Sequence, residues 1–234
     1  HYISLKDFES YKLKILRRMN HEPIAHIIGQ KDFWKNTFSV SKDTLIPRPD
    51  SEALIESVLK YLPQDENFNF LDLGTGSGCL IISILEEFKN SQGTGIDISK
   101  NTISIANKNK KNINNNLNLS FIVHDFFSYD TKGFDIIICN PPYVPKNELN
   151  EITEEVINFE PHLALFPKKG IKDCYGKIIS NIKLTNNKNC YVFFEIDYRD
   201  HVLVSNILKD NDFSVLAAEN DLTNRPRCIV AKMN

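Results

Sequence analysis

Four consecutive residues, Asn140-Pro141-Pro142-Tyr143, carry groups that could hold a planar amino group. They follow an apolar run, residues 134–139, that is typical of a buried strand. Two prolines prevent the strand from continuing and keep the backbone of Asn140 extended. The loop therefore offers an amide side chain, backbone carbonyls and an aromatic ring at the carboxyl end of a strand, where open α/β sheets bind ligands. A proline-rich turn without a ligand is the alternative interpretation.

A glycine-rich loop lies upstream, between an apolar strand-like run and the helical run Cys79–Lys89. Its candidate ligand-binding residues are Gly74, Thr75, Gly76, Ser77 and Gly78. Glycines allow the backbone to turn sharply and to approach a ligand closely. The spacing differs from the G-x-G-x-x-G pattern of nicotinamide enzymes, because Cys79 stands where the third glycine would fall. No Lys-Ser/Thr pair follows, so the loop does not match a Walker-type phosphate site.

Two further strand ends carry acidic side chains. Asp97 lies 23 residues after the first glycine of the loop, where a carboxylate can accept hydrogen bonds from ribose hydroxyls. The alternative is that Asp97 or Ser99 caps the following helix. At the next strand end, Asp125 could accept a hydrogen bond from an adenine amine and Phe126 could pack on the adenine ring. Phe127 is expected to be a core residue.

A parallel sheet is needed to bring these strand ends together. From Phe68 onward strand-like and helix-like segments alternate, which indicates βαβ units. The expected parallel strands are Phe68–Leu73, Gly93–Ile98, Leu119–Val123, Phe134–Cys139 and Cys190–Ile196. An antiparallel pair at the sheet edge is expected from Phe213–Ala217 and Cys228–Lys232. We therefore predict an α/β, Rossmann-like fold with a seven-stranded, mostly parallel sheet and an antiparallel last strand.

The segment before this sheet predicts a helix and a hairpin. Apolar residues recur at helical spacing up to about Asn20, and an alternating pattern over residues 31–46 predicts a short hairpin. Asp50 or Ser51 is expected to cap a helix that ends near Leu62. Farther along, the Asn-rich stretch Asn112–Asn118 is expected to be a loop.

Composition excludes several classes of protein. Of 234 residues 41% are hydrophobic, and the apolar runs are far shorter than the ~20 residues that span a bilayer, so no membrane partner is expected. A net charge of −2 and a pI near 6.3 argue against a large nucleic-acid-binding surface. The first residue is His1 and no charged-then-apolar leader follows, so we expect no signal peptide and a longer natural amino terminus.

Cysteine and histidine spacing indicates neither a metal site nor a disulfide framework. The five cysteines never form a C-x-x-C pair, and no H-E-x-x-H pattern is present. Scattered cysteines in odd number fit a reducing compartment, and a cytoplasmic protein without a metal is expected.

The order of these motifs resembles class I S-adenosylmethionine-dependent methyltransferases, and Asn-Pro-Pro-Tyr resembles members that methylate a planar amino or amide nitrogen. Other segments resemble the HemK/PrmC family: Pro23–Gly29, Leu45–Glu52, Phe159–Leu165, and Asp221-Leu222 with Arg227. The resemblance implies a class I methyltransferase fold. It also implies methyl transfer from S-adenosyl-L-methionine to the side-chain nitrogen N5 of the Gly-Gly-Gln glutamine in peptide-chain release factors, leaving S-adenosyl-L-homocysteine. A release factor is then the expected partner.

Domain boundaries follow from the resemblance. Residues 1–30 would be a remnant of the family's helical amino-terminal domain with its linker, residues 31–62 a hairpin and helix, and residues 63–234 the methyltransferase domain. The chain departs from the family at two positions: Phe126 stands where Trp is usual, and Asn224 stands where Gly is usual.

The site residues have the following expected roles. The Asn140 side-chain oxygen and the Pro141 carbonyl accept the two amide hydrogens, and Tyr143 packs on the amide plane. Pro142 and Arg48 are further substrate-binding candidates. The expected cofactor-binding residues are Gly74, Thr75, Gly76, Ser77, Gly78, Asp97, Asp125, Phe126 and Asn140. For Arg48, and for Glu160, Glu195 and Arg227, a structural ion pair is an equally good explanation.

Three other functions remain open at this point. An N-methyltransferase acting on an amino group of adenine or guanine in nucleic acid would share the chemistry of Asn-Pro-Pro-Tyr, but would be expected to carry a basic face. A nucleotide-binding oxidoreductase is disfavoured by the glycine spacing. A binding module without activity would not need the complete set of ligand-type residues.

Overall fold

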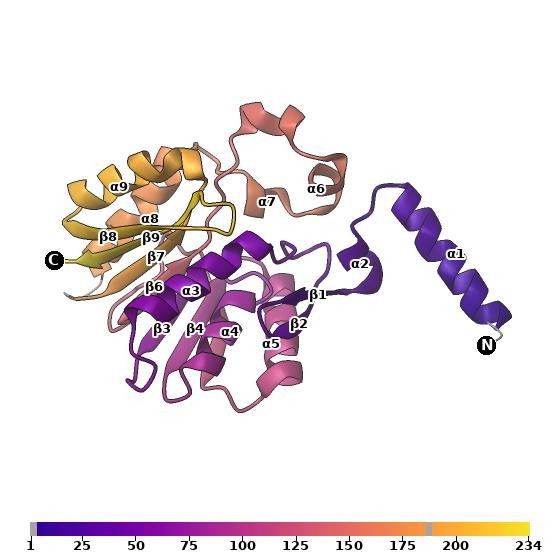
Figure 1. The fold of residues 1–234 in the computed structure, drawn as a ribbon, viewed down its shortest axis with the longest axis horizontal. Coiled ribbons are helices and arrows are strands. Elements are labelled where there is room, and N and C mark those ends of the chain that lie inside the picture. Colours follow the sequence, from indigo (N-terminus) through magenta and orange to yellow (C-terminus); the bar gives the residue numbers. More distant parts are fainter. Residues whose placement is uncertain (1–3, 186–188) are drawn as a thin grey trace.

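The computed structural model describes residues 4–185 and 189–234, and its centre is a seven-stranded sheet. The strand order is β5-β4-β3-β6-β7-β9-β8 (Figure 1). The bounds are β3 Asn69–Leu73, β4 Gln92–Asp97, β5 Leu119–Val123, β6 Ile136–Cys139, β7 Tyr191–Glu195, β8 Phe213–Asn220 and β9 Pro226–Met233. Strands β3 to β7 are parallel, and β9 runs antiparallel between β7 and β8. The predicted sheet is confirmed.

Helices cover both faces of the sheet (Figure 1). One face carries α3 (Glu52–Tyr61), α4 (Cys79–Glu87) and α5 (Lys100–Asn114), and the other carries α8 (Ile171–Thr185) and α9 (His201–Asp210). Two apolar cores result, because alternate residues of each central strand point to opposite faces. All four residues of β6 are buried, as expected for a strand covered on both sides.

The amino-terminal segment lies beside this domain. Helix α1 (Leu5–Met19) has no buried residue and extends away from the sheet (Figure 1). Its last residue is Met19 and Asn20 caps it, close to the predicted end, and α2 (Ile24–Ile28) follows. The predicted hairpin forms from β1 (Gln30–Phe33) and β2 (Asn36–Ser39). Along the described residues, no helix has the length and apolarity needed to cross a membrane.

A cap of short helices lies over the carboxyl edge of the sheet (Figure 1). It comprises the 3₁₀ helix η2 (Lys146–Glu151), α6 (Glu154–Phe159) and α7 (His162–Leu165), all between β6 and α8. Glu160, buried between α6 and α7, accepts a hydrogen bond from the backbone N–H of Ile46 at 3.1 Å. The cap is therefore fixed to the segment that leads from the hairpin through η1 (Pro49–Ser51) to α3. A third 3₁₀ helix, η3 (Tyr198–Asp200), follows β7.

Two local predictions were wrong. The segment Asn112–Asn118 is not all loop, because α5 continues to Asn114 while Ile113 packs against the core. Ser51 occupies the position before α3, but its hydroxyl makes no capping hydrogen bond. It accepts one from Asn140 instead. Of Asp97 and Ser99, the two residues considered as alternatives for the cap of α5, Ser99 takes this role, since its hydroxyl accepts a hydrogen bond from the backbone N–H of Thr102 at 3.3 Å.

Candidate active site

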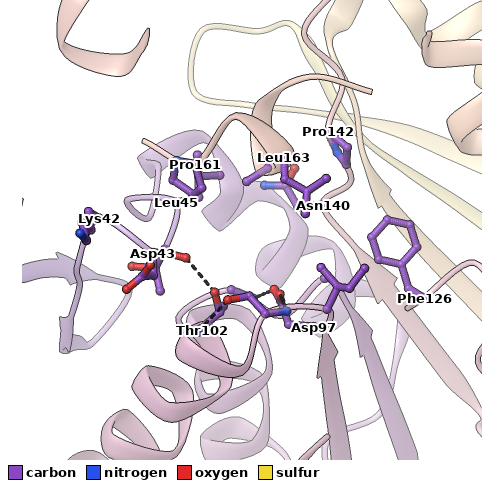
Figure 2. Close-up of a pocket in the computed structure, with 16 residues that line it drawn as sticks. Lys42, Asp43, Leu45, Asp97, Thr102, Phe126, Asn140, Pro142, Pro161 and Leu163 are labelled. Carbon is purple, nitrogen blue, oxygen red and sulfur yellow. Dashed lines mark hydrogen bonds between the residues drawn. The ribbon is translucent and has the colours of Figure 1, made fainter. Parts of the chain in front are cut away.

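The candidate site lies where the order of the strands reverses, between β3 and β6. Strands β3 and β6 are neighbours, yet the chain passes through β4 and β5 between them. Loops leaving two such strands diverge and open a crevice at the carboxyl edge. A cavity of about 280 Å³ lies there. Of the predicted residues it is lined by Gly74, Gly76, Asp97, Phe126, Asn140 and Pro142 (Figure 2).

The glycine loop exposes backbone to this cavity. Gly74 (φ 77°) and Gly76 (φ 56°) have left-handed backbone conformations that glycine adopts without strain. A Cβ atom added at Gly74 would lie in ordinary contact with the Phe126 ring at 3.6 Å, so the positive φ rather than a lack of space favours glycine here. Thr75 fixes the loop to the next strand, because its backbone N–H donates to the Ile96 carbonyl at 2.8 Å. Gly78 is the N-cap residue of α4 and also has a left-handed backbone conformation.

Asp97 is held at the end of β4 by backbone donors. Its Oδ2 accepts from the N–H of Gly76 at 3.2 Å, and its Oδ1 accepts from the N–H of Ser99 at 2.9 Å. Burial raises the pKa of Asp97, and these backbone hydrogen bonds act against that rise. A carboxylate oxygen can accept more than one hydrogen bond, so Asp97 retains acceptor capacity toward the cavity that it lines.

Phe126 joins this cavity to a second one of about 250 Å³. Asp125 is not among the residues that line the main cavity, but it lines the second one together with Phe126 and Leu163 of the cap. Asp125 also shapes the turn, because its Oδ1 accepts from the backbone N–H of Phe127 at 3.0 Å. Phe127 packs against the apolar core, as expected, with its ring centroid 4.5 Å from that of Phe126.

Asn140 presents one end of its amide to a hydroxyl. Its Nδ2 donates to the Ser51 Oγ at 3.3 Å. Within the described residues, neither its Oδ1 nor the carbonyl oxygen of buried Pro141 accepts a hydrogen bond. Two acceptors therefore remain unused beside the cavity.

Tyr143 is placed differently from its neighbours in the tetrapeptide. The cavity lining formed by the described residues does not include it, and its ring packs against the core. Its hydroxyl donates to Glu195 Oε1 at 3.1 Å, and burial raises the pKa of Tyr143. Glu195 is fully buried at the end of β7. Nearby, Arg227 lies 3.1 Å from Asp221 and 3.4 Å from Asp50 in ion pairs.

A smaller cavity of about 50 Å³ shares Asn140 with the main cavity and is lined by Arg48, Thr75 and Ser77, among others. The Arg48 guanidinium is paired with Glu160 at 2.5 Å. Thr75 donates its hydroxyl to Asp72 at 2.7 Å. The buried Ser77 hydroxyl has no hydrogen-bond partner among the described residues.

Sequence reasoning missed part of the site. The cap and the segment before η1 also line the main cavity, through Lys42, Asp43, Thr44, Leu45, Pro161, Leu163 and Ala164. Figure 2 shows the Asp43 carbonyl accepting a hydrogen bond from Thr102, at 2.7 Å. Asp72 was also missed, although it directly precedes the glycine loop. Burial raises the pKa of Asp72 to about 7, against the opposing hydrogen bond from Thr75.

Comparison with known proteins identifies the domain and the fold. A family model described as "Methyltransferase domain" matches residues 64–211. The structure is similar to the ribosomal protein L11 methylase from Lactobacillus delbrueckii subsp. bulgaricus, with a TM-score of 0.56, 16% identity and 79% of each chain covered. At that identity the likeness shows the fold alone, and the predicted class I methyltransferase fold is confirmed.

Curated relatives are closer in sequence. The chain is 35% identical to a release factor glutamine methyltransferase of Fusobacterium nucleatum, with 97% of this chain and 66% of that protein covered. It is 31% identical to a release factor glutamine methyltransferase of Caulobacter vibrioides, with 93% of this chain and 76% of that protein covered. It spans about half the length of several further curated relatives. On these matches, the chain belongs to the family of release factor glutamine methyltransferases.

Proposed function

We propose that this chain transfers a methyl group from S-adenosyl-L-methionine to the side-chain nitrogen N5 of the glutamine in the Gly-Gly-Gln motif of peptide-chain release factors. The observation that carries the proposal is Asn140, whose amide lies on the cavity wall with its N–H held by Ser51 and its oxygen unused. The names of the Fusobacterium and Caulobacter relatives support the choice of acceptor.

The residues of the main cavity fit this cofactor. Gly74 and Gly76 line the cavity without side chains, which suits a ligand in contact with the backbone. Asp97 has acceptor capacity for ribose hydroxyls. At the junction with the second cavity, Phe126 offers a face for adenine, and Asp125 offers an acceptor for its amine. The buried Ser77 hydroxyl, unpartnered among the described residues, is a further polar group available beside the loop.

The acceptor nitrogen must be positioned, because a carboxamide nitrogen delocalises its lone pair into the carbonyl and is a poor nucleophile. When bound, the cofactor supplies an activated sulfonium methyl group. In this proposal the Asn140 Oδ1 and the Pro141 carbonyl oxygen accept the two amide hydrogens. They thereby orient the nitrogen and stabilise the positive charge that develops on it. Positioning of this kind can contribute ~7–11 kcal/mol in well-oriented systems, so the proposal involves no metal.

The other residues of the tetrapeptide support this geometry. Pro142 lines the cavity and restricts the loop, and the Tyr143 hydroxyl anchors the end of the tetrapeptide on Glu195. Arg48 reaches the small cavity beside Asn140 and, in the proposal, borders the acceptor segment. We place the reaction in the cytoplasm, where release factors act. The five free cysteines are compatible with its reducing conditions.

The test is methyl transfer from labelled S-adenosylmethionine to a purified release factor, in parallel with one whose Gly-Gly-Gln glutamine is replaced by alanine. Label on the first protein alone is expected. Equal labelling of both would show a different acceptor atom. Absence of label, with S-adenosylhomocysteine still bound, would contradict the release-factor assignment and direct the assay to adenine and guanine amino groups in nucleic acid.

A further inference from the structure

Arg227, near the start of β9, connects three segments of the chain beside the candidate site. Its side chain is 12% exposed and donates to the Asp221 carboxylate through Nε at 3.2 Å and through Nη2 at 3.1 Å. Its Nη1 donates to the Ile196 carbonyl oxygen at 3.2 Å, and its Nη2 lies 3.4 Å from Asp50 Oδ2 in an ion pair. A guanidinium presents five N–H donors in one rigid plane, so a single side chain can hold several partners in fixed positions.

The contact with Asp50 restrains the turn that anchors Asn140. Asp50 and Ser51 are consecutive residues of η1, a single 3₁₀ turn in which the N–H of Ser51 donates to the Arg48 carbonyl at 3.1 Å. Ser51 is buried, and its Oγ accepts a hydrogen bond from the Asn140 amide at 3.3 Å. In so short a turn, a displacement of Asp50 also displaces Ser51. The ion pair between Arg227 and Asp50 therefore restrains the hydroxyl that holds the Asn140 side chain.

The contact with Ile196 restrains the anchor of Tyr143. Ile196 directly follows Glu195, the last residue of β7, and its N–H donates to the Arg227 carbonyl oxygen at 2.9 Å. The main chain and the side chain of Arg227 thus both bind Ile196. Glu195 accepts the Tyr143 hydroxyl at 3.1 Å. Because the residue next to Glu195 is held twice, the position of this acceptor is restrained as well.

We propose that Arg227 is a positioning residue that restrains both anchors of the tetrapeptide, Ser51 and Glu195. Arg227 is not among the described residues that line the main cavity, so it acts through these anchors. The inference rests on the proposed function, in which two oxygens of the tetrapeptide must meet the two hydrogens of the substrate amide together. Two acceptors directed at one –NH2 group tolerate little displacement, since a misplacement of about 1 Å can lower a rate by ~10²-fold.

Asp50→Ala removes the connection to η1 alone. The Asp50 side chain is 53% exposed, and Arg227 keeps its pair with Asp221, so this variant leaves no buried charge unpaired. We expect kcat for methyl transfer to fall by about 2- to 5-fold, because a half-exposed ion pair contributes modestly. The Kd for S-adenosylhomocysteine should stay within about twofold, since the residues that line the main cavity are unchanged. Asp50→Glu, which keeps the charge, should restore most of kcat, and Glu56→Ala, which removes an exposed carboxylate in α3, is the control.

Loss of the Arg227 side chain should cost more, because both anchors are released. The Asp221 side chain is 2% exposed and would be left buried without its cation, so Arg227→Gln is combined with Asp221→Asn. We expect kcat to fall by about 10- to 100-fold, with the Kd for S-adenosylhomocysteine within about threefold. The matched control is Arg225→Gln, an exposed arginine of the same loop that lies over the Tyr198 ring, and it should leave kcat unchanged. An unchanged kcat in the Arg227 variant would overturn the proposal.

A combination with Ser51→Ala distinguishes positioning from a general loss of stability. In Ser51→Ala the hydroxyl that holds Asn140 is already absent, so adding Asp50→Ala should lower kcat no further. Independent structural effects would instead multiply. Multiplicative losses would therefore contradict a role of the ion pair that acts through Ser51.

A measurement without an acceptor separates this inference from the proposed function. The side-chain amide signals of Asn140 in NMR spectra are identified by their loss in Asn140→Ala. They should shift in Asp50→Ala in the same direction as in Ser51→Ala, and they should not move in Glu56→Ala. Such shifts support the positioning role even if the natural sequence labels no release factor, in which case only the acceptor assignment fails. Signals that stay unchanged in Asp50→Ala would refute the positioning role, whatever the labelling result.

Discussion

The guanidinium of Arg48 lies 2.5 Å from the carboxylate of Glu160, although 112 positions separate the two residues. Glu160 also accepts from the backbone N–H of Ile46, so one buried carboxylate ties the segment before η1 to the cap. Both segments line the main cavity. The pair therefore helps to set the position of the cavity wall opposite the glycine loop.

Removing the Arg48 charge alone should destabilise the protein more than removing the charges of Arg48 and Glu160 together. Arg48→Met leaves the Glu160 carboxylate, whose side chain is 1% exposed, buried without its cation. We expect the free energy of unfolding to fall by about 3 kcal/mol, the lower end of the range for buried pairs because Arg48 is partly exposed. Arg48→Met combined with Glu160→Gln should lose less. Urea unfolding measures both changes. The control is Arg199→Met, which removes ion pairs with Glu148 and Asp197 nearer the surface and should cost less than Arg48→Met. A larger loss in the double variant would contradict the pairing argument.

Asn140→Ala should remove methyl transfer while largely preserving cofactor binding. It deletes an acceptor for the substrate amide, and loss of one such electrostatic contact lowers kcat by about 10²–10³. Steady-state kinetics gives kcat, and calorimetry with S-adenosylhomocysteine gives a Kd that should change by less than about threefold. Near-normal turnover in this variant would rule out the role assigned to the side-chain oxygen.

Asp97→Ala should weaken cofactor binding. The change removes the carboxylate that organises Gly76 and, in the proposal, accepts ribose hydroxyls. Loss of hydrogen bonds to a charged group costs about 1.5–3 kcal/mol, or about 10- to 100-fold in the Kd for S-adenosylhomocysteine. Asp130→Asn, at an exposed position after β5, serves as the control. An unchanged Kd in Asp97→Ala would place the nucleoside elsewhere.

Stability should decline between pH 4 and 7 because of Asp72. Its pKa is raised from an ordinary 3.8 to about 7 by burial. In this window the unfolded chain has released the proton and the folded chain retains it, so the free energy of unfolding falls as pH rises. The full effect is roughly 4 kcal/mol from a shift of about 3 units. Asp72→Asn should remove this decline in urea unfolding at pH 5 and pH 8, and Asp65→Asn, at an exposed turn, should not. A decline that persists in Asp72→Asn would assign it to other groups.

The order of residue types was enough to predict the sheet and the position of its ligand-binding loops. Apolar runs such as residues 136–139 are local signals, and prolines and glycines act on the backbone where they stand. Parallel strands must also place their carboxyl ends at one edge, so Gly74, Asp97 and Asn140 could be brought together before the structure was known.

The tertiary structure alone decided how the side chains at that edge are used. Ser51 suits a helix cap by local propensity, but its hydroxyl accepts from Asn140 instead, because the sheet order brings the two together. Tyr143 reaches Glu195 rather than the cavity lining for the same reason. The shift of the Asp72 pKa arises from the burial of its side chain in the middle of the sheet, on β3. Contacts between residues 50 or more positions apart, and the desolvation that they cause, depend on which strands become neighbours, and no local pattern of residue types encodes that order.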